Sequence, residues 1–96
     1  MTIEVIQVMP TDDFKVYVYF SDGKIKLFDA KHLIDKGVFK AISEISYFKE
    51  TCTVINKTLA WDIGGGRDEY KCLDLNPQTV YSKGIEVKDP LAEDAA

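Results

Sequence analysis

The residues best suited to chemistry in this sequence are one histidine and two cysteines, at His32, Cys52 and Cys72. A histidine can act as a general base, and histidine together with cysteine can bind zinc. The three positions match neither CxxC nor HxxxH spacing, however, and three ligands are too few for a structural zinc site. No serine or cysteine stands near His32 to serve as a nucleophile. We therefore predict no catalytic residue, no metal and no cofactor, and we expect a protein that is not an enzyme.

A second candidate is the run of Gly64, Gly65, Gly66 and Arg67. The backbone amides of such a loop can surround a phosphate, with the arginine as a clamp. The run lacks the Gly-Lys-Ser/Thr ending of a P-loop, and glycine runs also occur as plain flexible loops. Both interpretations stay open, so a small-ligand or anion-binding protein that uses the loop at residues 64–68 is the alternative function.

Acidic residues surround this loop, at Asp62, Asp68, Glu69 and Asp74. Paired carboxylates can carry out acid–base chemistry or hold Mg²⁺. Here they alternate with turn-forming residues, which is typical of a solvated loop. We interpret these carboxylates as solvated.

The third candidate is an aromatic surface, predicted from a β-hairpin over residues 14–29. Its first half alternates apolar residues with lysine and tyrosine at the two-residue period of a strand. Asp22-Gly23 suits a two-residue type I′ turn, which requires positive φ at both positions. This turn predicts four cross-strand pairs, namely Ser21 with Lys24, Phe20 with Ile25, Val18 with Leu27, and Tyr17 with Phe28.

In this register three aromatic side chains share the face opposite the Val18–Leu27 pair, and lysines 15, 24 and 26 lie around them. A helix or the second hairpin could cover part of this face, because tyrosines are often half-exposed. Alternatively it is a protein–protein surface, since aromatic residues ringed by charge are typical of interfaces. A second copy could bury the face through a two-fold axis. We expect a protein partner or a homodimer, bound through Tyr17, Tyr19 and Phe28.

The remaining patterns predict an α+β fold with a mostly antiparallel sheet. The sheet combines an N-terminal strand with two hairpins, and two short helices between the hairpins pack on one face. In the second hairpin an Asn56-Lys57 turn sets Cys52 opposite Trp61 and buries the indole ring. The other predicted elements are a strand at 3–9, helices at 30–36 and 40–49, an extended segment at 73–75 and a last helical turn at 76–81.

Short motifs along residues 3–82 follow the N-terminal strand in the order FSDG, FD, GVF, WDIG and LDLNPQTVY. This order resembles a family of small bacterial proteins, the family of domain of unknown function 2442. The resemblance implies a compact α+β unit of strands around one or two helices, with no established catalytic residues to carry over. Some relatives carry a helix-turn-helix domain, and some lie beside toxin–antitoxin-type genes. The segment GGGRDEYK and the C-terminal tail depart from the family pattern.

Length and charge restrict the class of protein further. The 96 residues make one domain, which we place at residues 1–84, followed by an acidic, flexible tail at residues 85–96. The net charge of −4 argues against nucleic acid and anionic membranes as partners, since both favour a basic surface. No apolar run reaches the roughly 20 residues of a membrane span, and no signal-peptide pattern is visible. Two free thiols then fit a cytoplasmic protein.

Overall fold

The computed structural model of this chain describes residues 3–64, 66 and 72–90. The strands are β1 (Val5–Pro10), β2 (Lys15–Phe20), β3 (Ile25–Asp29), β4 (Cys52–Ile55), β5 (Thr58–Trp61), β6 (Leu73–Asp74) and β7 (Ile85–Glu86). The helices are the 3₁₀ helix η1 (Gly37–Ile42), α1 (Ile45–Thr51) and α2 (Pro77–Lys83). This set of elements confirms the predicted α+β class.

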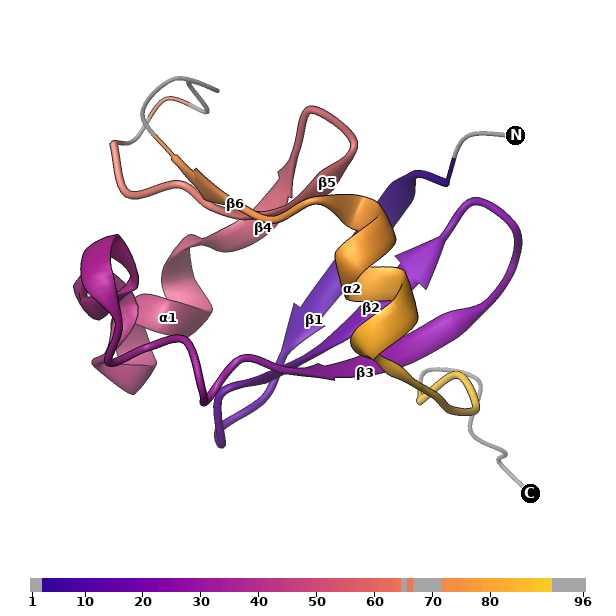
Figure 1. Ribbon diagram of the computed structural model, residues 1–96, viewed down its shortest axis with the longest axis horizontal. Helices are drawn as coiled ribbons and strands as arrows, with labels where there is room; N and C mark the ends of the chain where they lie inside the picture. The colour runs from indigo at the N-terminus through magenta and orange to yellow at the C-terminus, as the bar shows by residue number, and fades with distance from the viewer. Residues whose placement is uncertain (1–2, 65, 67–71, 91–96) are drawn as a thin grey trace.

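The strands form two antiparallel sheets, with the orders β1-β2-β3-β7 and β4-β5-β6. Figure 1 shows α2 across one face of the four-stranded sheet, while the three-stranded sheet and α1 lie beside it. We call the face that α2 covers the inner face, and the opposite face of the four-stranded sheet the outer face. The two sheets are linked at β1, because the Val5 amide donates to the Lys57 carbonyl at 2.9 Å.

The β4–β5 hairpin has the predicted register, with Cys52 opposite Trp61 and Val54 opposite Leu59. Its two turn residues have positive φ, 53° at Asn56 and 64° at the following lysine. A turn with positive φ at both positions matches the right-handed twist of the strands that it joins. Trp61 is completely buried, so the prediction for the indole ring is also confirmed.

The β2–β3 hairpin differs from its prediction by one residue. The Phe20 amide donates to the Lys24 carbonyl at 2.9 Å, so three residues form the loop instead of two. Within that loop Gly23 donates its amide to the Phe20 carbonyl at 3.0 Å, and its φ of 91° is the only positive one. The observed pairs are Val16 with Phe28, Tyr17 with Leu27, Val18 with Lys26, and Tyr19 with Ile25.

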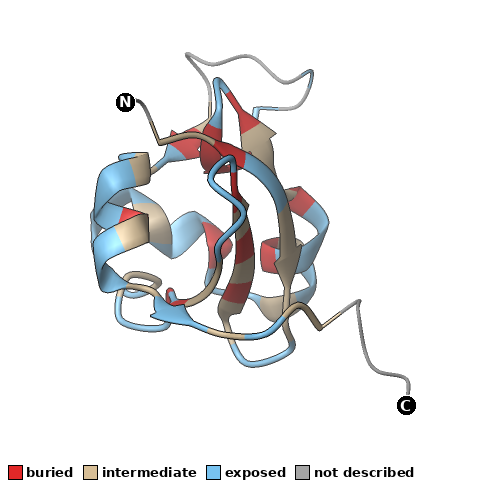
Figure 2. Ribbon diagram, turned by 90° about the vertical axis from the view of Figure 1, so that its right-hand side faces the viewer, coloured by how far each residue is buried: buried red, intermediate tan, exposed pale blue. Residues whose placement is uncertain are grey.

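This shift decides which residues of β3 enter the core, because a slip of one residue turns every side chain to the other face. Phe28 is only 2% exposed on the inner face, and the prediction that it lies beside Tyr17 and Tyr19 is wrong. Burial of the ring removes more apolar surface from water than burial of Leu27 would. Figure 2 shows the buried residues along the strands and the inward sides of the helices. The largest of them are Trp61, Phe20, Phe48, Ile42, Leu59, Val16, Val18 and Val80.

The segment between the two hairpins is less helical than predicted. Residues 31–35 form turns in place of the first helix, although Gly37 has positive φ, at 51°, as its predicted position requires. The second predicted helix is divided into η1 and α1. The division lies at Glu44, whose extended backbone ends the first piece and whose carboxylate accepts from the Tyr47 amide to cap the second.

The C-terminal part contains a helix and a short strand. Asn76 caps α2 by accepting from the Gln78 amide at 2.8 Å, which confirms the predicted helix start. Strand β7 then pairs with β3, so the sheet includes two residues that the predicted boundary assigned to the tail. Glycine is required at Gly84 because a Cβ there would lie 2.9 Å from the Lys26 Cβ. The predicted flexible tail stays a prediction for residues 91–96, which lie outside the described residues.

Candidate interaction surface

The outer face of the four-stranded sheet carries two rows of side chains that run across the strands. Each row takes one residue from each of the four strands or from the segment directly after the strand. The register aligns Met9, Tyr17, Leu27 and Ile85 in the first row. It aligns Gln7, Tyr19 and Ile25 in the second row, and Val87 completes this row because its amide donates to the Ile25 carbonyl at 2.9 Å. We call these eight residues the outer patch, and seven of them are aliphatic, aromatic or methionine.

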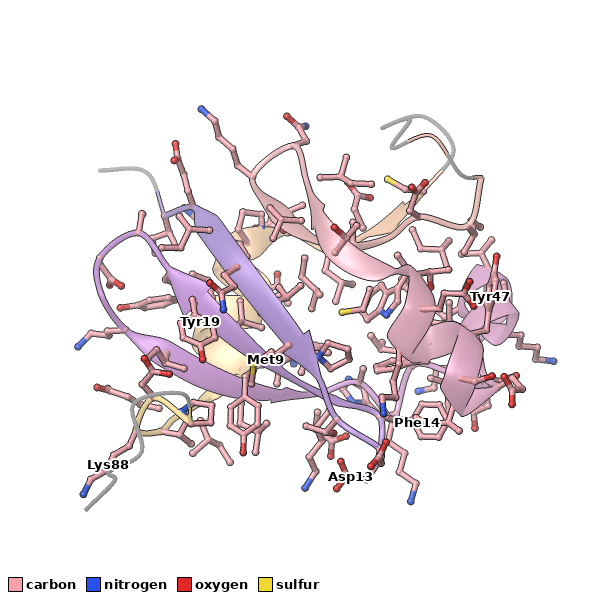
Figure 3. All side chains as sticks on the ribbon, turned by 180° about the vertical axis from the view of Figure 1, so that it is seen from behind. Met9, Asp13, Phe14, Tyr19, Tyr47 and Lys88 are labelled. Atoms are coloured by element: carbon pink, nitrogen blue, oxygen red, sulfur yellow. The ribbon has the colours of Figure 1, made fainter. Side chains whose placement is uncertain are left out.

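The outer patch is partly open to solvent. Ile85 is 70% exposed, and Gln7 is also exposed, while the other six are intermediate. None of the eight belongs to the buried core or packs against it among the described residues. Figure 3 shows this face from behind, with Tyr19 and Met9 directed away from the interior and no helix over them. The result is a contiguous apolar surface on a small protein, which is a feature of interaction sites.

Tyr19 anchors the C-terminal segment to this face. Its hydroxyl donates to the Asp89 carboxylate at 2.8 Å, across 70 residues of sequence. Burial of the hydroxyl, the hydrogen bond to Asp89 and the negative charge of Asp89 raise the pKa of Tyr19 to about 12. The hydroxyl is therefore neutral at physiological pH and already satisfied, so the ring presents an apolar surface.

The charges at the rim differ from the predicted ring of three lysines. Lys15 lies opposite Asp29 at one end of the patch, and its ammonium is 3.9 Å from the Asp13 carboxylate. Lys24 is opposite the buried Phe20, and its ammonium is 3.8 Å from Glu86, which is paired with Lys26, so this ion pair lies on the inner side of the sheet. The prediction for Lys24 and Lys26 is therefore wrong, because both lie on the inner side, and the Lys26 ammonium is 4.1 Å above the Tyr81 ring centre. The rim therefore carries both signs of charge.

The glycine loop is described only in part. Gly64 and Gly66 are exposed, and the φ of Gly66 is 74°. Gly65 and Arg67 lie outside the described residues, together with Asp68 and Glu69. The anion-binding interpretation of this loop therefore stays a prediction.

The histidine and the cysteines lie apart from the outer patch. His32 is exposed, with its ring 6.2 Å from that of Phe28. Cys52 is partly buried beside the core, and burial raises the pKa of its thiol to about 12. A neutral thiol is a weak nucleophile. Across residues 3–64, 66 and 72–90, no three His, Cys, Asp or Glu side chains are grouped so that they could hold a metal ion.

The family model described as "Protein of unknown function (DUF2442)" matches residues 5–86. The chain belongs to this family. The match includes β7, which agrees with the extension of the sheet beyond Gly84. Neither a curated protein nor a solved structure matches the chain. Within the described part of the chain, no helix has the length and apolar character needed to cross a membrane.

The sequence reasoning identified two of the eight members of the outer patch, Tyr17 and Tyr19. It missed Ile25 and Leu27 because the predicted register turned both toward the core. A signal for the correct register was present, since Ser-Asp-Gly also suits a three-residue loop in which only the glycine needs positive φ. Ile85 and Val87 carried no local signal, because β7 consists of only two residues.

Proposed function

We propose that this protein is a non-enzymatic interaction or regulatory module, and that the outer patch is its binding surface. The observation that carries the proposal is the pair of aligned apolar rows on a sheet face that no described helix covers. In an ordinary antiparallel sheet, residues alternate along each strand so that apolar side chains face the core and polar side chains face the solvent. Here four strands present apolar side chains on that face, so contact with another protein surface explains them.

The chemistry of the patch suits a protein partner. Tyrosine offers a large rigid ring with few rotatable bonds, and aromatic residues with methionine are enriched in interface cores. Leu27, Ile25 and Met9 supply aliphatic and thioether surface beside the rings. Charged residues at the rim, namely Lys15 and Asp29, fit the polar border that surrounds such a core.

The experiment is photocrosslinking in cells of the native host, with p-benzoylphenylalanine in place of single exposed residues. Ile85 in the outer patch and Val38 in η1 are matched sites, because their side chains are 70% and 69% exposed. We expect adducts from the Ile85 variant and few from the Val38 variant. Equal labelling at both sites would mean that the outer patch has no special role.

A second substitution links the adducts to the patch. Tyr17→Glu places a charge in the centre of the first row and should abolish the adducts at position 85. Emission from the buried Trp61 checks that this variant is folded, since exposure of the indole shifts the emission to the red. Adducts that survive Tyr17→Glu in a folded protein would contradict the proposal.

A further inference from the structure

We infer that the partner of the outer patch is a second copy of this chain, related by a two-fold axis that runs parallel to the strands between β2 and β3. This inference rests on the proposed function, and it adds the identity and the orientation of the partner. A two-fold interface requires only one surface that is complementary to itself. The arrangement of residues in the outer patch meets this requirement in its apolar rows and in its charges.

The apolar rows complement themselves about this axis. Because the sheet order is β1-β2-β3-β7, rotation about this axis places β2 of one copy over β3 of the other and β1 of one copy over β7 of the other. Each row therefore lies over the same row of the second copy in reverse order. Tyr17 lies over Leu27 of the second copy, Tyr19 over Ile25, and Met9 over Ile85. Every aromatic ring then meets an aliphatic side chain.

The charges select this orientation over the other two-fold choice. Lys15 and Asp29 are opposite each other on β2 and β3, next to the first row. An axis parallel to the strands places Lys15 of each copy over Asp29 of the other, which forms two reciprocal ion pairs. An axis perpendicular to the strands would instead set this charged pair toward the opposite end of the sheet, away from Asp29 of the other copy.

The size of the face indicates a weak dimer. Strand spacing and rise give a face of about 20 Å by 20 Å, so that two copies bury on the order of 800 Å² in total. Interfaces of this size belong to transient complexes. We therefore expect association that depends on concentration in the range of about 10–500 μM.

The experiment exploits the reciprocal pair with two single variants. Lys15→Asp places two carboxylates against each other in its own dimer, and Asp29→Lys places two ammonium groups against each other. In a one-to-one mixture, each new charge meets the opposite charge of the other chain, so only the mixed dimer is favourable. By sedimentation equilibrium, we expect each variant alone to dimerise at least about tenfold more weakly than the wild type, and the mixture to recover within about threefold.

A matched control separates this pairing from a general charge effect. Lys83→Asp makes the same change of charge on α2, which covers the inner face, so this variant should dimerise like the wild type. Mixing Lys83→Asp with Asp29→Lys should give no recovery beyond that of the wild type with Asp29→Lys. Trp61 emission confirms that every variant is folded.

The outcomes separate this inference from the proposed function. A wild type that stays monomeric to about 1 mM overturns the homodimer. A wild type that dimerises without selective recovery in the mixture overturns the assigned axis. In either case, adducts from Ile85 to a different protein would leave the interaction module standing. Adducts with the mass of two copies, together with recovery in the mixture, support the inference.

Discussion

The two hairpins of this protein differ in how closely their register follows from the residues of their turns. The β4–β5 hairpin has the two-residue turn and the pairing that its sequence predicts. The β2–β3 hairpin was predicted from a stronger turn signal, Asp22-Gly23, and is displaced by one residue. The stronger local signal therefore gave the poorer prediction, because it fits two loop lengths that differ by one residue.

The choice between those loop lengths is made outside the turn. With a three-residue loop only Gly23 adopts positive φ, and Asp22 uses its carboxylate to accept from the Lys24 amide at 2.9 Å. The same loop turns Phe28 into the core and Leu27 onto the outer face. In the β4–β5 turn two residues other than glycine adopt positive φ, which asparagine tolerates, and the adjacent pairs Ile55–Thr58 and Val54–Leu59 close the turn around them.

The largest expected effect tests the register of the β2–β3 hairpin directly. Phe28→Ala should lower the free energy of unfolding by about 3–5 kcal/mol, because it leaves a cavity in the core. Leu27→Ala on the outer face should lower it by roughly 1 kcal/mol or less, since this side chain is not buried in the core. Chemical denaturation of both variants measures the difference. Equal losses, or a larger loss for Leu27→Ala, would contradict the observed register and favour the two-residue turn.

The next effect concerns the conformation of the loop. Gly23→Val should cost about 1–3 kcal/mol of stability, because a β-branched residue is disfavoured at positive φ. The φ of Gly23 is 91°, and no atom lies within 4 Å of a Cβ at this position, so the cost is one of backbone conformation. Gly23→Ala is the control and should cost less. An unchanged denaturation midpoint for Gly23→Val would show that the glycine does not adopt this conformation.

The third prediction concerns the C-terminal segment, which pairs with β3 and accepts a hydrogen bond from Tyr19 of β2. Tyr19→Phe should cost about 0.5–1.5 kcal/mol, the usual contribution of one hydrogen bond. Because the pKa of Tyr19 is raised to about 12, its contribution to stability is fully present below pH 10 and is lost as the pH rises through 12. Urea titrations between pH 8 and 12 should therefore show the two proteins converging at high pH. A constant difference across that range would contradict the bond to Asp89.

The smallest effect sharpens the comparison from the β4–β5 side. Lys57→Gly should raise stability by about 0.5 kcal/mol. The conformational energy of a lysine at positive φ, which glycine removes, is slightly larger than the extra entropy cost of ordering glycine on folding. Asn56→Gly should change stability less, since asparagine tolerates positive φ. Thermal unfolding of the two variants measures this order. Destabilisation by Lys57→Gly would mean that the turn does not hold this lysine under strain.

Local chemistry determined several elements of this protein by itself. The Asn76-Pro77 start of α2, the positive φ of Gly37 and the turn at Asn56-Lys57 depend on interactions within a few residues. Each was predicted because a cap or a turn is a property of neighbouring residues. The burial of Trp61 followed from the register of its own hairpin.

The tertiary structure decided the register of β2–β3 and the addition of β7. Each depends on partners distant in sequence, such as β7 on β3 or Tyr19 on Asp89. These contacts also create the outer patch, since Leu27, Ile25 and Ile85 reach it only through the observed pairing. The physical reason is that a strand has a two-residue period, so its pattern defines two faces but not which one the core will take.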